Sequence, residues 1–174
     1  MRLVTAILLA TLVHSAGAQQ PDVVFVPTPQ EVVDRMLEMA KVGKGDVLYD
    51  LGSGDGRIPV TAAKRFGIRA VGIDIDPQRI AEATENVRKA GVQDRVTLIR
   101  GDIFDPAIKI NEASVVTLYL LPALNLKLRP RLWSELKPGT RVVSNSFDMG
   151  QDWPAEKTEM VENYTIYFWT IKPR

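Results

Sequence analysis

The sequence contains no cysteine and only one histidine, His14. The absence of cysteine excludes disulfide bonds, thiolate nucleophiles and cysteine-ligated zinc. Because His14 lies in a segment that we expect to be removed, the rest of the chain has to work without an imidazole. Transition-metal sites depend heavily on these two residue types. We therefore predict no bound metal.

The chain also lacks an excess of charge of either sign. It has 22 basic and 21 acidic residues among 174, which gives a formal net charge of +1 at pH 7. A nucleic-acid-binding surface usually shows itself as a basic excess, so we expect no nucleic acid partner. The length and the 45% hydrophobic content suit one domain with one core. We expect this domain to be a monomer.

The first 18 residues differ from the rest of the chain. Arg2 gives a positive start, residues 3–13 are almost entirely apolar, and residues 16–18 read AGA. This layout predicts a secretory signal peptide, because the apolar run falls short of the roughly 20 residues that span a bilayer. It implies export to the periplasm. An uncleaved membrane anchor, which would keep the domain close to a membrane, is the alternative.

After the leader, an extended arm is expected at residues 19–27 and a single domain at residues 28–174. The segment 28–31 (TPQE) resembles a capping box, so Thr28 is expected to cap a helix. Pro130 is expected to interrupt or begin a later helix, because its ring does not fit a helix interior. We predict strands at residues 47–50, 69–74, 95–100, 115–121 and 141–147, helices at 58–66, 77–90 and within 124–136, and an antiparallel pair of strands at 158–161 and 165–171. This alternation predicts an α/β fold, a Rossmann-like doubly wound seven-stranded sheet that is mostly parallel with an antiparallel C-terminal pair.

The turn that follows the first predicted strand is rich in glycine. Residues 49–58 read YDLGSGDGRI. The dinucleotide-binding fingerprint G-x-G-x-x-G (or A) is not matched here. Arg57 occupies the position of its last glycine, where close packing of helix and strand needs a small residue. Asp50 would also repel a pyrophosphate. A phosphate-binding P-loop fails as well, because no Gly-Lys-Ser/Thr follows.

A cationic ligand fits the same turn better. S-adenosylmethionine carries a sulfonium and an ammonium, for which Asp50 supplies a counter-charge, while its carboxylate can meet the N-terminus of the next helix. Asp74, 22 residues after Gly52 at the end of the second strand, is placed to accept the ribose hydroxyls. Asp102, directly after the third strand, is placed to accept the exocyclic amine of adenine. Each aspartate could instead cap a loop, and the glycines alone could form only a tight turn. The predicted cofactor site consists of Asp50, Gly52, Ser53, Gly54, Asp74 and Asp102.

From residue 28 onward the sequence resembles a class I, seven-strand S-adenosylmethionine-dependent methyltransferase. The first motif of that family corresponds to residues 50–56, its ribose-binding acid to Asp74 and its adenine-side acid to Asp102. One subgroup is similar at further positions, the small lysine methyltransferases of the ATP synthase c-subunit and adenine nucleotide translocase with their bacterial relatives. These positions are LYDLGSGDGRI (48–58), VPTP (26–29), YLLP (119–122), LRP (128–130) and KPGT (137–140).

The resemblance implies a methyl acceptor, and a protein lysine is the expected one. The position held by Asn/Asp-Pro-Pro-Tyr in enzymes that methylate nucleic acid amines reads YLLP here, which also disfavours nucleic acid. Tyr119 is the predicted catalytic residue that lines the methyl-transfer channel, with Thr28, Asn145 and Asp148 as weaker candidates. A small-molecule acceptor stays open, and so does an inactive cofactor-binding interaction domain. Export conflicts with the supply of S-adenosylmethionine, which is made inside the cell.

Overall fold

The protein is described here by a computed structural model that places residues 25–173. The leader predicted at residues 1–18 and the arm as far as residue 24 lie outside the described residues. Residues 25–29 form an irregular segment that leads into the first helix. In the described range, no helix has both the length and the hydropathy needed to cross a membrane.

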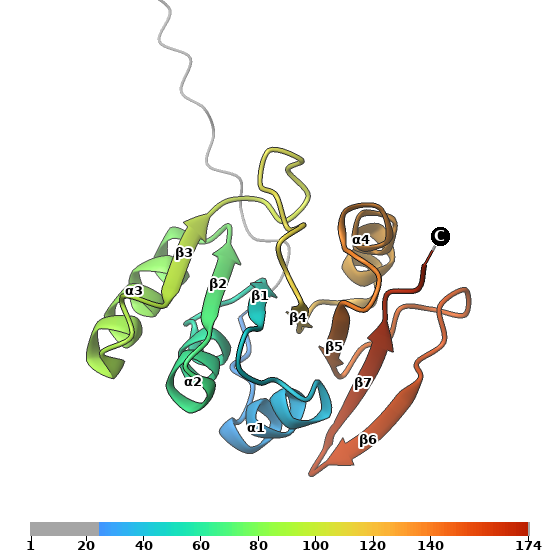
Figure 1. Cartoon of the computed structure of the whole chain (residues 1–174), viewed down its shortest axis with the longest axis horizontal. Coiled ribbons are helices and arrows are strands. Elements are labelled where there is room, and N and C mark those ends of the chain that lie inside the picture. The colour runs from blue at the N-terminus through green and yellow to red at the C-terminus, as the bar shows by residue number, and fades with distance from the viewer. Residues whose placement is uncertain (1–24, 174) are drawn as a thin grey trace, which may run out of the picture.

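The described chain forms one seven-stranded sheet flanked by helices (Figure 1). The strand order is β3-β2-β1-β4-β5-β7-β6, with parallel pairing from β3 to β5 and antiparallel pairing of β5 with β7 and of β7 with β6. The predicted fold class is therefore confirmed. The elements are α1 (Gln30–Met39), β1 (Val47–Leu51), α2 (Arg57–Phe66), β2 (Arg69–Asp74), α3 (Pro77–Ala90), β3 (Val96–Arg100), β4 (Val115–Leu118), α4 (Pro122–Glu135), β5 (Arg141–Asn145), β6 (Lys157–Val161) and β7 (Tyr164–Thr170).

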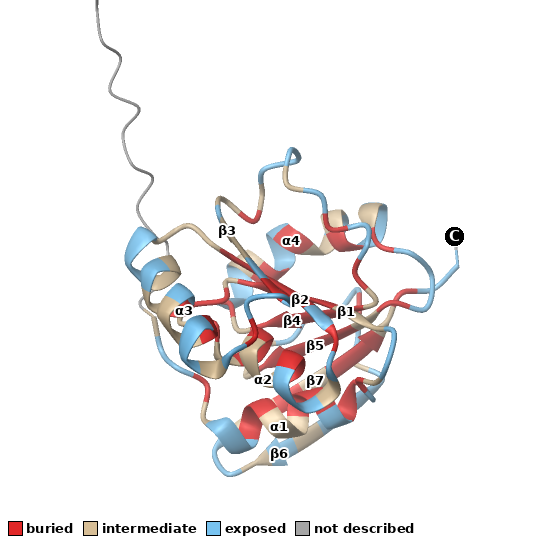
Figure 2. Ribbon diagram, turned by 60° about the vertical axis from the view of Figure 1, so that its left-hand side comes forward, coloured by how far each residue is buried: buried red, intermediate tan, exposed pale blue. Residues whose placement is uncertain are grey.

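Two apolar layers hold the helices to the sheet. Helices α1, α2 and α3 cover one face, where the buried side of α1 packs toward β5 and β7. Helix α4 covers the other face, where Leu128 and Leu132 are fully buried against Leu118 and Val142. Figure 2 shows the inner strands buried on both faces, while β6 forms a partly exposed edge. This pattern is expected for parallel strands that are covered by helices on both sides.

The predicted capping box is wrong. Helix α1 begins at Gln30 with Pro29 as its N-cap residue, and no side chain caps it. The hydroxyl of Thr28 instead accepts a hydrogen bond from Asn145 Nδ2 at 3.4 Å, and the Thr28 carbonyl accepts one from Arg57 Nη1 at 2.7 Å. Contacts with distant segments therefore fix Thr28 in place of the local cap.

The expectation for Pro130 is also wrong, because it lies inside α4. Its ring removes the hydrogen bond that the carbonyl of Leu126 would accept. Both residues are exposed to solvent, so water can satisfy that carbonyl. The fourth strand is also shorter than predicted and ends at Leu118, which leaves Tyr119 in the connection to α4.

Candidate active site

A cavity of about 610 Å³ opens at the carboxyl ends of β1, β2, β3 and β4. Parallel sheets bind ligands at this edge, where successive connections leave in opposite directions. Here β1 is followed by β2 on one side and has β4 on the other. The cavity wall contains five carboxylates, from Asp50, Asp55, Asp74, Asp76 and Asp102, and two guanidinium groups, from Arg57 and Arg79.

The glycine turn closes the bottom of the cavity. Gly52, Gly54 and Gly56 have φ values of +85°, +53° and +76°, a region that costs other residues strain. The amide groups of Gly52 and Ser53 both donate to the carbonyl of Ile73, at 2.8 and 2.9 Å, and so tie the turn to β2. The backbone conformation alone therefore favours glycine at these three positions.

The open side of each of these glycines is filled by a side chain of the protein. A Cβ atom on Gly54 would lie 2.2 Å from the Phe25 ring, and one on Gly52 would lie 2.8 Å from Leu120. A Cβ atom on Gly56 would lie 2.9 Å from the Cβ atom of Ala83 on α3. Gly56, the N-cap residue of α2, therefore allows the start of α2 to pack closely against α3. A side chain as large as that of Arg57 would not fit there.

Asp50 is buried, with only 3% of its surface exposed. Its Oδ1 accepts a hydrogen bond of 2.8 Å from the hydroxyl of Thr117 on β4. Burial raises the pKa of Asp50 to about 8, the Thr117 bond opposes this rise, and the charges of Asp74 and Asp55 add to it. A buried carboxylate with this pKa favours a cationic ligand that would stabilise its ionised form.

Asp74 and Asp102 both cap loops and both face the cavity. Asp74 accepts hydrogen bonds from the amide of Gly54 at 2.7 Å and from the amide of Asp76 at 2.9 Å. Asp102 accepts one from the amide of Phe104 at 2.8 Å. These bonds orient each carboxylate, and the lone pairs that they leave can accept ligand hydroxyl or amine groups.

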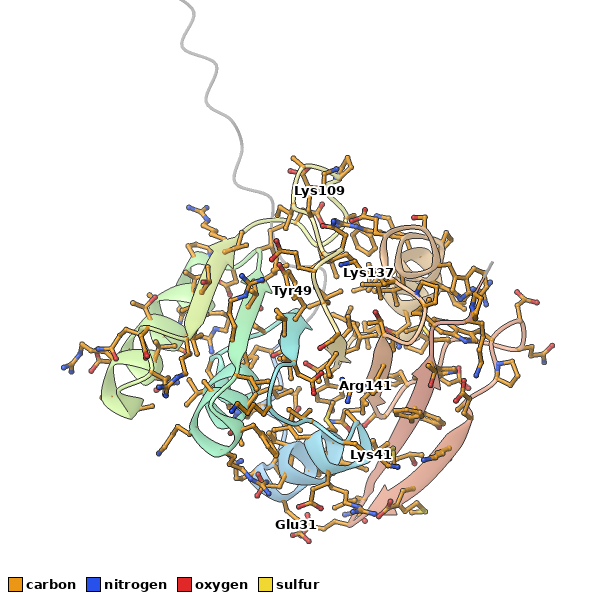
Figure 3. All side chains as sticks on the ribbon, viewed as in Figure 1. Glu31, Lys41, Tyr49, Lys109, Lys137 and Arg141 are labelled. Carbon is orange, nitrogen blue, oxygen red and sulfur yellow. The ribbon has the colours of Figure 1, made fainter. Side chains whose placement is uncertain are left out.

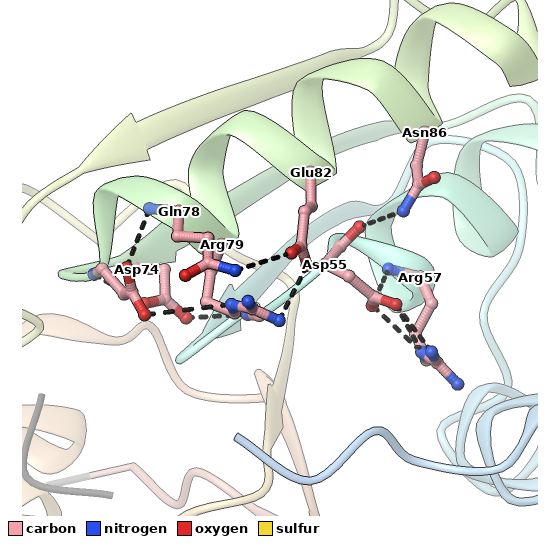
Figure 4. A network of polar contacts seen from close by, with 9 residues as sticks. Asp55, Arg57, Asp74, Gln78, Arg79, Glu82 and Asn86 are labelled. Atoms are coloured by element: carbon pink, nitrogen blue, oxygen red, sulfur yellow. Dashed lines mark hydrogen bonds and ion pairs between the residues drawn. The ribbon is translucent and has the colours of Figure 1, made fainter. Parts of the chain in front are cut away.

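A polar network surrounds the first turn of α3 (Figure 4). Asp76 caps the helix by accepting from the Gln78 amide at 2.8 Å, as expected from the Asp-Pro pair. Asp55 pairs with Arg57 at 2.6 Å. The Arg79 guanidinium carbon lies 4.7 Å from the centre of the Phe25 ring, within cation–π range.

The other side of the cavity is apolar and aromatic. Tyr119 and Phe147 stack with ring centres 6.2 Å apart, and both line the cavity together with Thr28. Among residues 25–173, no side chain or backbone group is hydrogen-bonded to the Tyr119 hydroxyl. Of the weaker candidates, Asn145 is fully buried behind Thr28, and Asp148 is exposed and caps the turn at Gly150.

Several cavity residues were not singled out from the sequence. These are Phe25, which packs on the glycine turn, and Phe104 and Phe147 in the apolar wall. Thr117, which is fully buried and holds Asp50, was not singled out either. Ser53, which was singled out, is buried and its hydroxyl has no hydrogen-bond partner in the described chain. The sequence contains only weak signals for the residues that were not singled out, since an aromatic residue in a loop more often packs against its neighbours than lines a binding site.

The cavity matches the chemistry of S-adenosylmethionine. Its acidic groups outnumber its basic groups, which suits a sulfonium and an ammonium, and Ile103 and Phe104 beside Asp102 offer apolar surface to a purine ring. The carboxylates lie at the ends of three neighbouring strands, β1, β2 and β3. These features fit one extended ligand that has a positively charged end.

Comparisons with known proteins agree with this chemistry. A family model described as the ANTKMT methyltransferase domain matches residues 50–157. The chain is 48% identical over 156 residues to a protein-lysine N-methyltransferase of Saccharolobus islandicus (strain REY15A), covering 87% of this chain and 95% of that protein. It is 31% identical over 148 residues to the adenine nucleotide translocase lysine N-methyltransferase of Mus musculus, covering 82% of this chain and 63% of that protein.

A solved structure is also similar. It is described as an RNA methyltransferase from Salinibacter ruber in complex with S-adenosyl-L-homocysteine, with a TM-score of 0.83 and 55% identity over 86% of this chain and 95% of that one. The fold, the acidic cavity and these relatives define an S-adenosylmethionine-dependent methyltransferase. The chain belongs to the ANTKMT methyltransferase family.

Proposed function

We propose that this methyltransferase transfers the methyl group of S-adenosylmethionine to the side-chain amine of a protein lysine. The observation that carries the proposal is the division of the cavity into an acidic side, at the ends of β1 to β3, and an aromatic side around Tyr119 and Phe147. The descriptions of the Saccharolobus and mouse relatives as lysine methyltransferases support a lysine acceptor.

The acidic side is proposed to hold the cofactor. Asp50 faces its cationic end, Asp74 accepts the ribose hydroxyls, and Asp102 accepts the adenine amine. Gly52, Ser53 and Gly54 form the turn beneath the methionyl end. Asp50 and Asp74 are both fixed by hydrogen bonds to the protein, so little reorganisation is needed when the cofactor binds.

The aromatic side is proposed to receive the acceptor. S-adenosylmethionine supplies a methyl group that is already activated by its sulfonium, so the protein has to align the nucleophile and keep it unprotonated. An apolar wall lowers the pKa of a lysine amine, because it disfavours the charged form. The Tyr119 hydroxyl can accept a hydrogen bond from the amine and so aim its lone pair at the methyl group. The proton released after transfer leaves through the open mouth of the cavity.

The acceptor can be identified by following a radiolabelled methyl group. Purified enzyme is incubated at pH 8 with labelled cofactor and a cell extract, and the products are then treated with either protease or ribonuclease. We expect protease alone to release the label, and acid hydrolysis to yield methyl-lysine. An Asp50→Asn variant serves as the matched control, because it should bind the cofactor poorly at this pH.

Three other outcomes would contradict the proposal. Label released by ribonuclease would indicate the activity that the Salinibacter protein's description names. Label found only in acid-soluble material would indicate a small-molecule acceptor. Absence of label together with measurable binding of S-adenosylhomocysteine would indicate an inactive cofactor-binding domain.

A further inference from the structure

We propose that Arg131 of α4 is a positioning residue for the cofactor, because it fixes the loop that carries Asp102. This inference rests on the proposed role of Asp102 in accepting the adenine amine. The loop consists of residues 101–110, which contribute Asp102, Ile103 and Phe104 to the cavity wall. It lies beyond the end of β3 and has no strand pairing of its own.

The guanidinium group of Arg131 joins two carbonyl groups of this loop. It donates to the carbonyl of Ile103 and to the carbonyl of Ile108. Its Nε donates to Glu135 one turn later on α4, at 2.9 Å, and Glu135 in turn accepts from the amide of Ile110 at 3.4 Å. The Arg131 side chain is only 11% exposed, so solvent screens these bonds weakly. Two residues of α4 thus hold the loop at three backbone positions.

One of these bonds acts directly on Asp102. The carbonyl of Ile103 and the amide N–H of Phe104 belong to the same planar peptide group. Arg131 binds the carbonyl side of that plane, and Asp102 Oδ1 accepts from the N–H side at 2.8 Å. If the plane rotates, the N–H direction changes and the carboxylate turns with it. Arg131 therefore sets the direction in which the free oxygen of Asp102 points.

A second contact from α4 holds the same part of the loop. Lys127 Nζ lies 3.9 Å from the centre of the Phe104 ring. The middle of the loop, residues 105–107, is exposed to solvent, and the Lys109 ammonium donates to the carbonyl of Pro106 there (Figure 3). The contacts from α4 therefore hold both ends of the loop, at residues 103–104 beside the cavity and at residues 108–110.

Arg129 provides a matched control on the same helix. Its side chain is 16% exposed and it also holds a loop, by donating to the carbonyl of Met149 at 2.8 Å and to Asp152 at 2.8 Å. That loop follows β5 and lies on the aromatic side of the cavity, away from Asp102. An Arg-to-Lys change at either position keeps the charge and removes the forked geometry.

The test is calorimetric binding of S-adenosylhomocysteine and of its inosine analogue, which lacks the adenine amine. We expect Arg131→Lys to raise the Kd for S-adenosylhomocysteine about tenfold, since the adenine amine would lose its hydrogen bond to the Asp102 carboxylate and a bond to a charged group is worth about that factor. The Kd for the inosine analogue should change by less than about threefold, because the affected contact is already missing there. Arg129→Lys should leave both Kd values within about twofold, since it holds a different loop.

A double-mutant cycle separates positioning from general stability. If Arg131 acts through Asp102, adding Arg131→Lys to Asp102→Asn should weaken binding no further. Should Arg131→Lys fold poorly, Glu135→Gln loosens the same guanidinium and should raise the Kd for S-adenosylhomocysteine about threefold. Parent protein that does not bind S-adenosylhomocysteine would refute the proposed function itself. Binding by the parent with equal losses for both ligands in Arg131→Lys, or with no loss, would refute the role of Arg131 alone.

Discussion

Asp50 gives the sharpest prediction, because its ionisation should be coupled to the charge of the ligand. Its pKa is raised to about 8 by burial, so most molecules carry a neutral Asp50 at pH 7 before the ligand binds. A cationic cofactor should bind preferentially to the ionised form and release a proton. With a pKa near 8, the ionised fraction of Asp50 rises about fiftyfold between pH 6 and pH 8. The part of the cofactor affinity that depends on the ionised carboxylate should rise by the same factor and then level off.

The assay is calorimetric titration with S-adenosylmethionine at several pH values, for the parent and for Asp50→Asn. The cofactor titrates as well, but this contribution cancels in the ratio of the two Kd values. We expect the ratio of mutant to parent Kd to be small at pH 6, where the parent carboxyl is already neutral, and to increase toward pH 8. A ratio that does not depend on pH would refute the coupling between Asp50 and ligand charge.

The same shift predicts how the stability of the ligand-free protein depends on pH. The folded state holds a proton on Asp50 that the unfolded state gives up near the ordinary value of 3.8. Its contribution to stability is therefore complete below that pH, and it is lost at up to about 1.4 kcal/mol per pH unit as the pH rises to about 8. Asp50→Asn should remove this slope, so that the mutant unfolds at a higher temperature than the parent at pH 9 without ligand.

Three further predictions concern the rest of the site. Tyr119→Phe should lower kcat about tenfold while the Kd for S-adenosylhomocysteine changes little, because it removes one hydrogen bond to the acceptor; an equal loss in Kd would place Tyr119 on the cofactor side instead. Phe25→Ala should speed the dissociation of S-adenosylhomocysteine, measured by stopped flow, since its ring covers the glycine turn; an unchanged rate would mean that the ring moves away on binding. Gly56→Ala should lower the free energy of unfolding in urea by about 2 kcal/mol, because its new Cβ would meet Ala83 at a positive φ. Gly67→Ala is its control and should cost about 1 kcal/mol, since φ is also positive there but nothing lies within 4 Å; equal losses would contradict the packing argument.

The elements with clear chemical boundaries could be predicted from the sequence. Helix α3 begins at Pro77 with Asp76 as its N-cap and ends at Ala90, followed by Gly91, which adopts the left-handed conformation as the C-cap. Strand β2 was predicted at its observed bounds, because an apolar run there is enclosed by the end of one helix and the start of the next. Local signals of this kind act over a few residues, and no distant contact overrides them.

The errors arose where distant contacts decide the local structure. Thr28 has the right neighbours for a cap, but Asn145 and Arg57 bind its two oxygen atoms from far along the chain. Pro130 was expected to interrupt or begin a helix, but it lies inside α4 on the solvent side, where water can replace the lost hydrogen bond. Neither environment can be seen in a local pattern.

The two sides of the cavity also differ in how far the sequence could reveal them. The carboxylates proposed for the cofactor lie within residues 50–102, each directly at the end of a strand, so the order of the elements was enough to bring them together. The side proposed for the acceptor is assembled from Thr28, Tyr119 and Phe147, which are about 120 positions apart at most and share no periodic pattern. Small changes in these connecting segments can alter the shape of the acceptor side while the strand ends stay in place. Relatives with the same cofactor site can therefore differ in their acceptors. The residues that select the acceptor are to be sought in these connecting segments and not in the glycine turn.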